Sequence, residues 1–208
     1  MYVRQRLSAL VYTLEYIACA SKRMPLFRKE FVMSHETFYQ DPYAGLADQG
    51  SLQTRLAHLY HCLREQFASI ERFSVALYDE DNDTLANMYS FDETGPVLKG
   101  YEAKLWEVQS LQDLVTTGNI RVVHDMRQLR TDVPSEHTDT LLAQGFRSSV
   151  TMPVINHGKL RGVMFLNSRK ADYFTEPMVV YCTLWAHLAA NQFLHPTEEE
   201  LAQGASSN

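Results

Sequence analysis

The residues with the clearest potential for binding chemistry lie in the segment 145–168, GFRSSVTMPVINHGKLRGVMFLNS. Polar and apolar residues alternate along its first half, and Asn156, His157 and Gly158 follow, which predicts two strands joined by a tight turn. The returning strand, 160–166, is apolar on both faces, so we expect the hairpin in the middle of a sheet. Polar side chains in such a hairpin must be paired with the protein or with a ligand.

Four polar side chains of this hairpin form our predicted ligand-binding floor: Arg147, Ser149, Thr151 and Asn167. An arginine offers a planar fork of donors that suits a carboxylate, nitrate or phosphate group. The same residues allow an interpretation without a ligand. In that interpretation Arg147 pairs with Asp125 or Glu136, and the hydroxyl groups bond to nearby backbone.

The residues that cover this floor are expected between positions 92 and 144. The further candidates for ligand contact are Tyr89, Phe91, Tyr101, Trp106, His124 and Asp125. Aromatic side chains at these positions would also suit a hydrophobic core.

A second chemical pattern is the H-x-x-H-C spacing of His58, His61 and Cys62. Residues at i and i+4 share a helix face, so His58 and Cys62 could hold one metal ion. The same face could be solvated or could contact a second subunit. Because these residues lie away from the leucine stripe of the helix, we favour that interpretation and predict no metal site here.

The run Asp79, Asp81 and Asp83 resembles the start of a calcium-binding loop. Such a loop needs glycine at its sixth position and glutamate at its twelfth, where this chain has Thr84 and Ser90. We therefore predict a solvated hairpin loop.

The three cysteines, Cys19, Cys62 and Cys182, are odd in number and far apart, which favours a reducing cytoplasm over a disulfide framework. The chain has no Walker loop, dinucleotide-binding glycine pattern, H-E-x-x-H pair or nucleophile elbow. We predict a cytoplasmic protein that is not an enzyme.

The composition is that of an ordinary globular protein. The chain has 208 residues, 45% hydrophobic and 21% charged, with a formal net charge of -6. It lacks the basic stripe of a nucleic-acid-binding protein. We therefore predict no nucleic-acid partner. No run of about 18 apolar residues occurs, so we also predict no membrane span.

We predict three regions along the chain. Residues 1–50 read as an N-terminal helix followed by an irregular extension, 51–194 as one domain, and 195–208 as a disordered tail rich in Glu and Ser. Arg4 and Arg6 before an apolar stretch also resemble a secretory signal, but Glu15 interrupts that stretch. Translation starting at Met33 is a further alternative.

The elements of the domain follow from periodicity. Ser51 can cap a first helix with one leucine-rich stripe, and Thr175 can cap a long last helix. Between them we expect strands at 73–78, 85–91 and 120–124, a short helix around 103–115, a helix from Ser135 to Gln144 closed by Gly145, and the hairpin. Hairpins imply an antiparallel sheet whose one face the terminal helices cover.

From about Ser51 to Phe193 this pattern resembles a GAF domain. The carrying segments are FSVALYDEDNDTLANMYS, VVHDMRQL, LLAQGFRSSVTMPVINHGKLRGVMFLNSRKADYFT and LWAHLAANQF. The resemblance implies an α+β fold, similar to profilin-like and PAS-like folds. It has a central six-stranded antiparallel sheet, N- and C-terminal helices packed on one face, and a pocket on the other face under loops and short helices. It also implies a homodimer formed through the terminal helices.

Members of this family bind cyclic nucleotides, tetrapyrroles, haem, nitrate or amino-acid-like ligands, so the cofactor and ligand of this chain stay open. Reduction of methionine sulfoxide and covalent bilin attachment, two chemistries of the family, need a pocket thiolate. No cysteine lies between Cys62 and Cys182, the stretch that contains the whole predicted roof. The Asn-Lys-Phe-Asp-Glu set of the cyclic-GMP-binding members is also absent.

We therefore predict a non-catalytic sensory domain that binds an unidentified small molecule and signals, as a homodimer, to a separate protein. One alternative is a degenerate domain that serves only for dimerisation or docking. Another is a small enzyme using His124 and Asp125, although adjacent strand residues point to opposite faces.

Overall fold

The computed structural model describes residues 29–33, 36–41, 43–46, 50–92, 103–104, 109–129 and 136–195. The chain divides into two compact units, Met1–Pro42 and Tyr43–Asn208. In the first unit, β1 (Lys29–Met33) and β2 (Glu36–Tyr39) pair as antiparallel strands, where the sequence predicted an irregular extension. The helix predicted before them and the tail after His195 lie outside the described residues.

The second unit contains a six-stranded sheet in the order β5-β4-β3-β8-β7-β6, with every neighbouring pair antiparallel. Its strands are β3 (Arg72–Asp79), β4 (Thr84–Asp92), β5 (Ala103–Lys104), β6 (Arg121–Val123), β7 (Ser148–Asn156) and β8 (Lys159–Ser168). The predicted hairpin is β7 and β8, and β8 lies at the centre between β3 and β7. The α+β fold predicted from the sequence is thereby confirmed.

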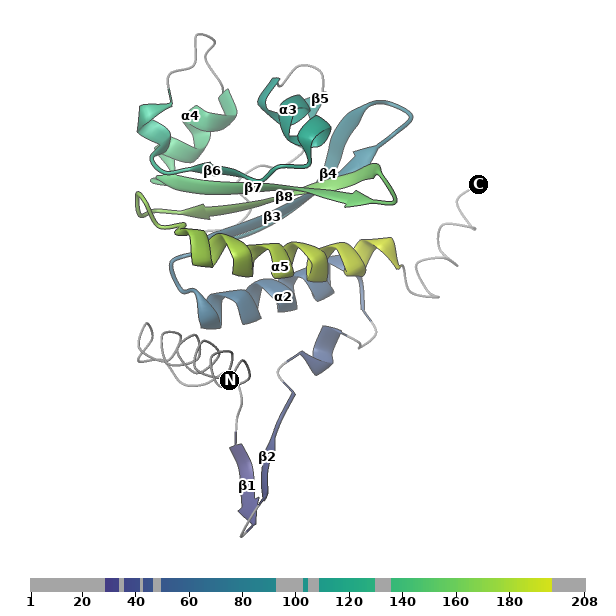
Figure 1. Ribbon diagram of the computed structural model, residues 1–208, viewed down its shortest axis with the longest axis vertical. Coiled ribbons are helices and arrows are strands. Elements are labelled where there is room, and N and C mark those ends of the chain that lie inside the picture. The colour runs from purple at the N-terminus through teal and green to yellow at the C-terminus, as the bar shows by residue number, and fades with distance from the viewer. Residues whose placement is uncertain are drawn as a thin grey trace, which may run out of the picture. The chain divides into compact units, whose positions relative to one another are not determined.

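Two helices cover one face of this sheet, α2 (Leu52–Gln66) and α5 (Glu176–Leu194), and they lie side by side (Figure 1). Ser51 caps α2 as predicted, since its hydroxyl accepts a bond from the Thr54 amide. Thr175 precedes α5 but makes no side-chain capping bond. We call this side of the sheet the helix face.

The largest hydrophobic core lies between these helices and the sheet. Leu56, Leu59 and Leu63 of α2 pack there with Trp185 and Ala189 of α5. From the strands the same core receives Phe73, Val75, Val150, Met152, Met164 and Leu166. These strand residues alternate with the ones on the opposite face, which we call the open face.

Two short helices lie over the two ends of the open face, α3 (Gln109–Thr117) and α4 (Glu136–Ala143) (Figure 1). Leu111 and Leu114 of α3 form one small core with Leu85 and Val163. A second small core lies beneath α4 and contains Leu141. The open face between these two cores is where the polar strand residues lie.

The structure corrects the helix predicted around 103–115. Ala103 and Lys104 instead pair with Leu85 and Thr84 at the edge of β4, and α3 begins only at Gln109. The turns behave as expected, because Gly145 has a φ of +85° after α4 and Gly158 has a φ of +76° in the β7–β8 turn. Ser135, the predicted cap of α4, lies outside the described residues. No helix in the described part of the chain is long and apolar enough to span a bilayer.

Candidate functional site

The open face of the sheet carries two rows of neighbouring side chains, because residues opposite one another in a sheet point to the same side. The first row is Asp92, Arg72, Asn167, Ser149 and Val123. The second row is Ser90, Ser74, Phe165, Thr151 and Arg121. Three of the four residues of the predicted floor, Ser149, Thr151 and Asn167, thus lie together on this face.

Arg72 is a further polar residue of this face, and it was not among the predicted site residues. Its side chain is 0% exposed, and its Nη1 donates to Asn167 Oδ1 at 2.7 Å. Its Nε donates to Ser90 Oγ at 3.3 Å, and Ser90 lies 2.9 Å from Ser74 Oγ. Burial lowers the pKa of Arg72 to about 10, while Asp92 acts in the opposite direction, so the guanidinium stays charged at neutral pH. The available signal was the polar alternation of Arg72 and Ser74 at the start of an apolar strand.

Ser149 and Thr151 lie beside this network without joining it. They are 9% and 5% exposed, and neither hydroxyl makes a hydrogen bond within the described part of the chain. Neither hydroxyl oxygen is among the fully buried polar atoms without a partner, so both are accessible to an external partner. Three stretches of the predicted cover, 93–102, 105–108 and 130–135, lie outside the described residues, and the cavity above the two hydroxyl groups stays a prediction.

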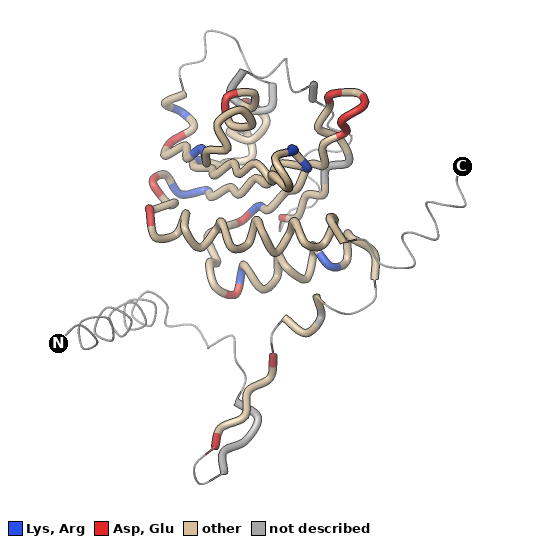
Figure 2. Tube along the Cα trace, turned by 45° about the vertical axis from the view of Figure 1, so that its right-hand side comes forward, with Lys and Arg blue, Asp and Glu red and all other residues tan. Residues whose placement is uncertain are grey.

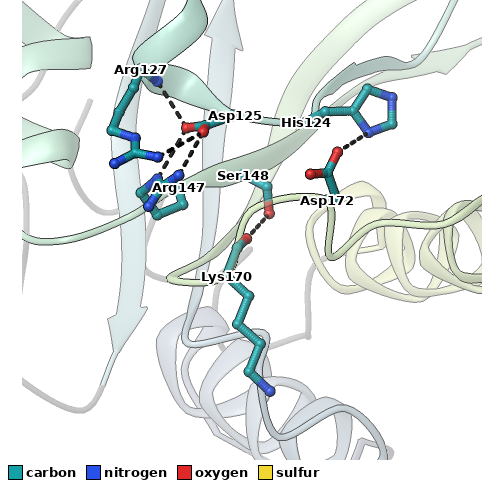
Figure 3. Close-up of polar contacts among 7 residues, drawn as sticks. All are labelled: His124, Asp125, Arg127, Arg147, Ser148, Lys170 and Asp172. Carbon is teal, nitrogen blue, oxygen red and sulfur yellow. Dashed lines mark hydrogen bonds and ion pairs between the residues drawn. The ribbon is translucent and has the colours of Figure 1, made fainter.

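Arg147 does not lie on this floor. It precedes β7, and its guanidinium bonds Asp125 twice, with Nε to Oδ1 at 3.0 Å and Nη2 to Oδ2 at 2.5 Å (Figure 3). Arg127 adds a bond from its backbone amide and one from Nη2, at 3.1 and 3.2 Å. The Arg147 bonds hold the pKa of Asp125 well below its usual range, and Asp125 raises that of Arg147. The ligand-free interpretation of Arg147 is the one that the structure shows.

His124 lies in the loop after β6, and its exposed ring faces Asp172, with Nδ1 3.7 Å from Oδ1 (Figure 3). The neighbouring Asp125 turns instead toward Arg147. The two residues proposed for the enzyme alternative therefore have different partners. Both follow β6, which ends at Val123, so the argument from strand alternation does not apply to them. Nearby, Ser148 donates to the backbone carbonyl of Lys170 at 2.7 Å, so this hydroxyl is also used within the protein.

Tyr89 and Phe91 correct the prediction of a roof contact. They lie opposite Val75 and Phe73 on β3 and pack into the helix-face core. Phe91 stacks with Tyr60 of α2 at a ring distance of 6.1 Å. Because these rings are on the opposite face from Ser149, they cannot line a pocket above it. Trp106 and Tyr101 lie outside the described residues.

The described cysteines are buried in the helix-face core as well. Burial raises the pKa of the Cys62 thiol, and it raises that of Cys182 to about 12. His58 Nε2 lies 3.7 Å from Cys62 Sγ, the pair predicted to share a helix face. Within the described segments no three His, Cys, Asp or Glu side chains are grouped to hold a metal.

Figure 2 shows that Asp and Glu residues gather in the loop between β3 and β4. Several of their carboxylates make contacts within the protein. Asp79 Oδ1 accepts bonds from the amides of Asp81 and Asn82, and Tyr78 donates its hydroxyl proton to Asp83 at 2.6 Å. Lys159 of the neighbouring hairpin pairs with Glu80 at 2.8 Å. These contacts are those of a surface hairpin loop, as predicted.

One hollow, with a volume of about 370 Å³, lies away from the open-face floor, between α5 and the edge of β7. Its apolar lining includes Met152, Val154, Ile155, Ala186, Ala190 and Leu194. Neither Ser149 nor Thr151 contributes to it, so it is distinct from the predicted ligand site.

This architecture defines a class of protein: an α+β domain whose antiparallel sheet has two terminal helices on one face and polar side chains on the other. The sequence pattern of the GAF domain family matches residues 51–206, and the chain belongs to that family. GAF domains form a general family of sensory and signalling domains. The comparison with curated proteins found no match.

Several solved structures share this fold. The free methionine-R-sulfoxide reductase of Neisseria meningitidis is 20% identical, with a TM-score of 0.56 over 73% of this chain and 83% of that one. The GAF domain of a phosphoenolpyruvate-protein phosphotransferase from Coxiella burnetii is 17% identical, with a TM-score of 0.59 over 79% and 92%. The chromophore-binding domain of a bacteriophytochrome from R. palustris is 12% identical, with a TM-score of 0.54 over 73% and 58%. At these identities the likeness concerns the fold alone.

Proposed function

We propose that this chain is a non-catalytic sensory domain that binds a small molecule on the open face and signals to a separate protein as a homodimer formed through α2 and α5. The observation that carries the proposal is the pair of hydroxyl groups of Ser149 and Thr151. The two residues lie almost fully buried in the middle of the sheet, and their hydroxyl groups bond to nothing in the described part of the chain. A ligand above them would supply the missing partners.

The non-catalytic part rests on where reactive groups lie. Cys62 and Cys182 are in the helix-face core with raised thiol pKa values, so neither offers a thiolate to the open face. Asp125 is engaged by Arg147, and His124 is exposed beside Asp172. These four residues therefore do not place a nucleophile and a general base together beside the floor.

The signalling mechanism that we propose is a shift in population. A ligand that binds one arrangement of the covering segments and helices more tightly than another favours that arrangement. A difference of about 1–3 kcal/mol between the two affinities suffices for a useful response. The strands that carry Ser149 and Thr151 also carry Val150 and Met152, which pack against the helices, so floor and helices share one sheet.

A thermal-unfolding screen tests the proposal. The full chain would be heated with cyclic AMP, cyclic GMP, haemin, biliverdin, nitrate, phosphate, succinate or methionine. We expect one chemical class to raise Tm, since a ligand at 100 times its Kd stabilises the folded state by about 2.7 kcal/mol. The variant Thr151→Leu, which fills the floor, should unfold normally alone but lose the increase.

Thr183→Leu on α5 makes the same change away from the open face and should respond to the ligand like the wild type. If no probe raises Tm, or if Thr151→Leu responds as the wild type does, ligand sensing on this face is refuted. In that outcome the domain serves as a dimerisation or docking module.

A further inference from the structure

We propose that the molecule bound on the open face is an anion, and that Arg121 binds its carboxylate or other oxyanion group together with Thr151, Ser149 and Asn167. This inference rests on the proposed function and adds the charge of the ligand and Arg121, which is not among the predicted site residues. The four residues come from three neighbouring strands, and we call them the donor arc.

Asn167 has its orientation fixed by Arg72. A guanidinium group has only donors, so the atom that receives its 2.7 Å bond is the amide oxygen of Asn167. The amide nitrogen, with two N–H groups, is then left without a partner in the described part of the chain. Asn167 lies opposite Ser149 in register, so this nitrogen and the Ser149 hydroxyl are neighbours on the open face.

Arg121 completes the arc at the edge strand. It lies opposite Thr151 in the β6–β7 pairing, while the next residue, Val122, packs into the helix-face core. Alternation therefore places Arg121 on the same face as Thr151. Its side chain is half-buried, and it makes no ion pair or hydrogen bond with any described residue.

The charges on this face leave Arg121 uncompensated. Arg72 lies directly opposite Asp92 in the β3–β4 pairing, on strands that β8 and β7 separate from the strand of Arg121. The opposite charges of Arg72 and Asp92 offset each other. Burial lowers the pKa of Arg121, no carboxylate among the described residues acts on it, and arginine stays charged at physiological pH. A half-buried cation without a carboxylate partner favours an anionic ligand and repels a cationic one.

The donor types match an oxyanion. Carboxylate, nitrate and phosphate oxygens accept several hydrogen bonds at once, and a guanidinium group binds them in a bidentate manner. The amide nitrogen of Asn167 donates, and the hydroxyls of Ser149 and Thr151 can donate as well. The arc contains no carboxylate that would compete for these donors.

The test compares anions with a neutral analogue of the same shape. Calorimetry would measure the Kd of nitrate, phosphate, succinate and uncharged succinamide for the full chain at constant ionic strength set with chloride. We expect at least one anion to bind, and succinamide to bind at least tenfold more weakly than succinate. If nitrate or phosphate binds and succinate does not, the ligand is a small inorganic anion. If succinate binds and the inorganic anions do not, the ligand is a carboxylate.

Variants then locate the site. Arg121→Gln should weaken the binding of the active anion at least tenfold, and Thr151→Val should weaken it severalfold. Arg64→Gln, the same substitution on α2 at the opposite face, should leave the Kd unchanged. If Arg121→Gln does not fold, the succinamide comparison and Thr151→Val still decide the question.

Several results would overturn the inference. An anion whose Kd is unchanged in both Arg121→Gln and Thr151→Val binds elsewhere. A neutral or cationic ligand that loses its binding in Thr151→Leu but not in Arg121→Gln would leave the proposed sensory function standing and refute the anionic class. The absence of any binding in the wider screen would refute both.

Discussion

Asp125 decides what Arg147 does in this protein. A buried carboxylate needs charged or polar partners, and the guanidinium of Arg147 satisfies both of its oxygens. The backbone around the pair is also tied together, because the Met126 amide donates to the Arg147 carbonyl at 2.6 Å and the Arg147 amide donates to Ser168 at 2.7 Å. The pair therefore acts as a clasp between the segment after β6 and the ends of the β7–β8 hairpin.

The clasp predicts a pH-dependent contribution to stability. The pKa of Asp125 is held below its usual range in the folded state, so its charged form stabilises the fold above the unfolded pKa of about 3.9. That contribution is lost as pH falls below about 4 toward the folded pKa. We expect Asp125→Asn to have a lower Tm at pH 7 and a smaller loss of Tm on acidification than the wild type, as measured by circular dichroism.

Asp81→Asn in the exposed β3–β4 loop is the matched control and should unfold like the wild type at pH 7. A variant Asp125→Asn with unchanged Tm at pH 7 would show that the clasp contributes nothing to stability.

The central strand β8 has to pass unusually close to β3. A Cβ atom placed on Gly162 would lie 2.6 Å from the backbone oxygen of Ala76, far closer than two such atoms can approach. Because the neighbour is backbone in the middle of the sheet, it cannot move aside as a flexible side chain would. Gly162 is thus a condition for the pairing that brings Asn167 beside Arg72.

Gly162→Ala should destabilise the domain by about 1–3 kcal/mol through this overpacking. Urea unfolding followed by tryptophan fluorescence would measure the change. Gly158→Asn, in the β7–β8 turn where no atom lies within 4 Å of a new Cβ, should cost much less, since asparagine tolerates a positive φ. Equal stabilities of the two variants would contradict the close-approach argument.

Helix α5 leaves an apolar stripe uncovered by its own domain. Val180 and Leu184, one helical turn apart, are 61% and 57% exposed, whereas Cys182 and Trp185 face the core. Large exposed apolar groups at i and i+4 on one helix are typical of a helix that packs against another subunit. This stripe supports the proposed homodimer.

Light scattering checks the association. The chain has a mass of 23.9 kDa, and we expect the wild type at micromolar concentration to show twice that mass. Leu184→Glu should give the monomer mass with an intact fold by circular dichroism. Ile155→Glu, an equally apolar-to-charged change at an exposed position on β7, should remain dimeric. A monomeric wild type, or a dimeric Leu184→Glu, would refute dimerisation through α5.

Local patterns were enough to predict most of the elements. The leucines after Ser51 repeat with helical spacing, and polar and apolar residues alternate along β7, so each segment carries its own evidence of which side is buried. The turn at Gly158 follows from backbone freedom of a single residue. The family resemblance then supplied the order in which these elements assemble, and the fold was predictable for that reason.

The partner of each polar side chain was not predictable, because it depends on segments distant in sequence. Arg147 lies 22 positions from Asp125, and Arg72 lies 95 positions from Asn167. Strand register also put Tyr89 and Phe91 on the helix face, and it put Arg121 beside Thr151. Periodicity tells which side chains of a segment share a face; only the pairing of the strands decides which face that is and which charges meet there.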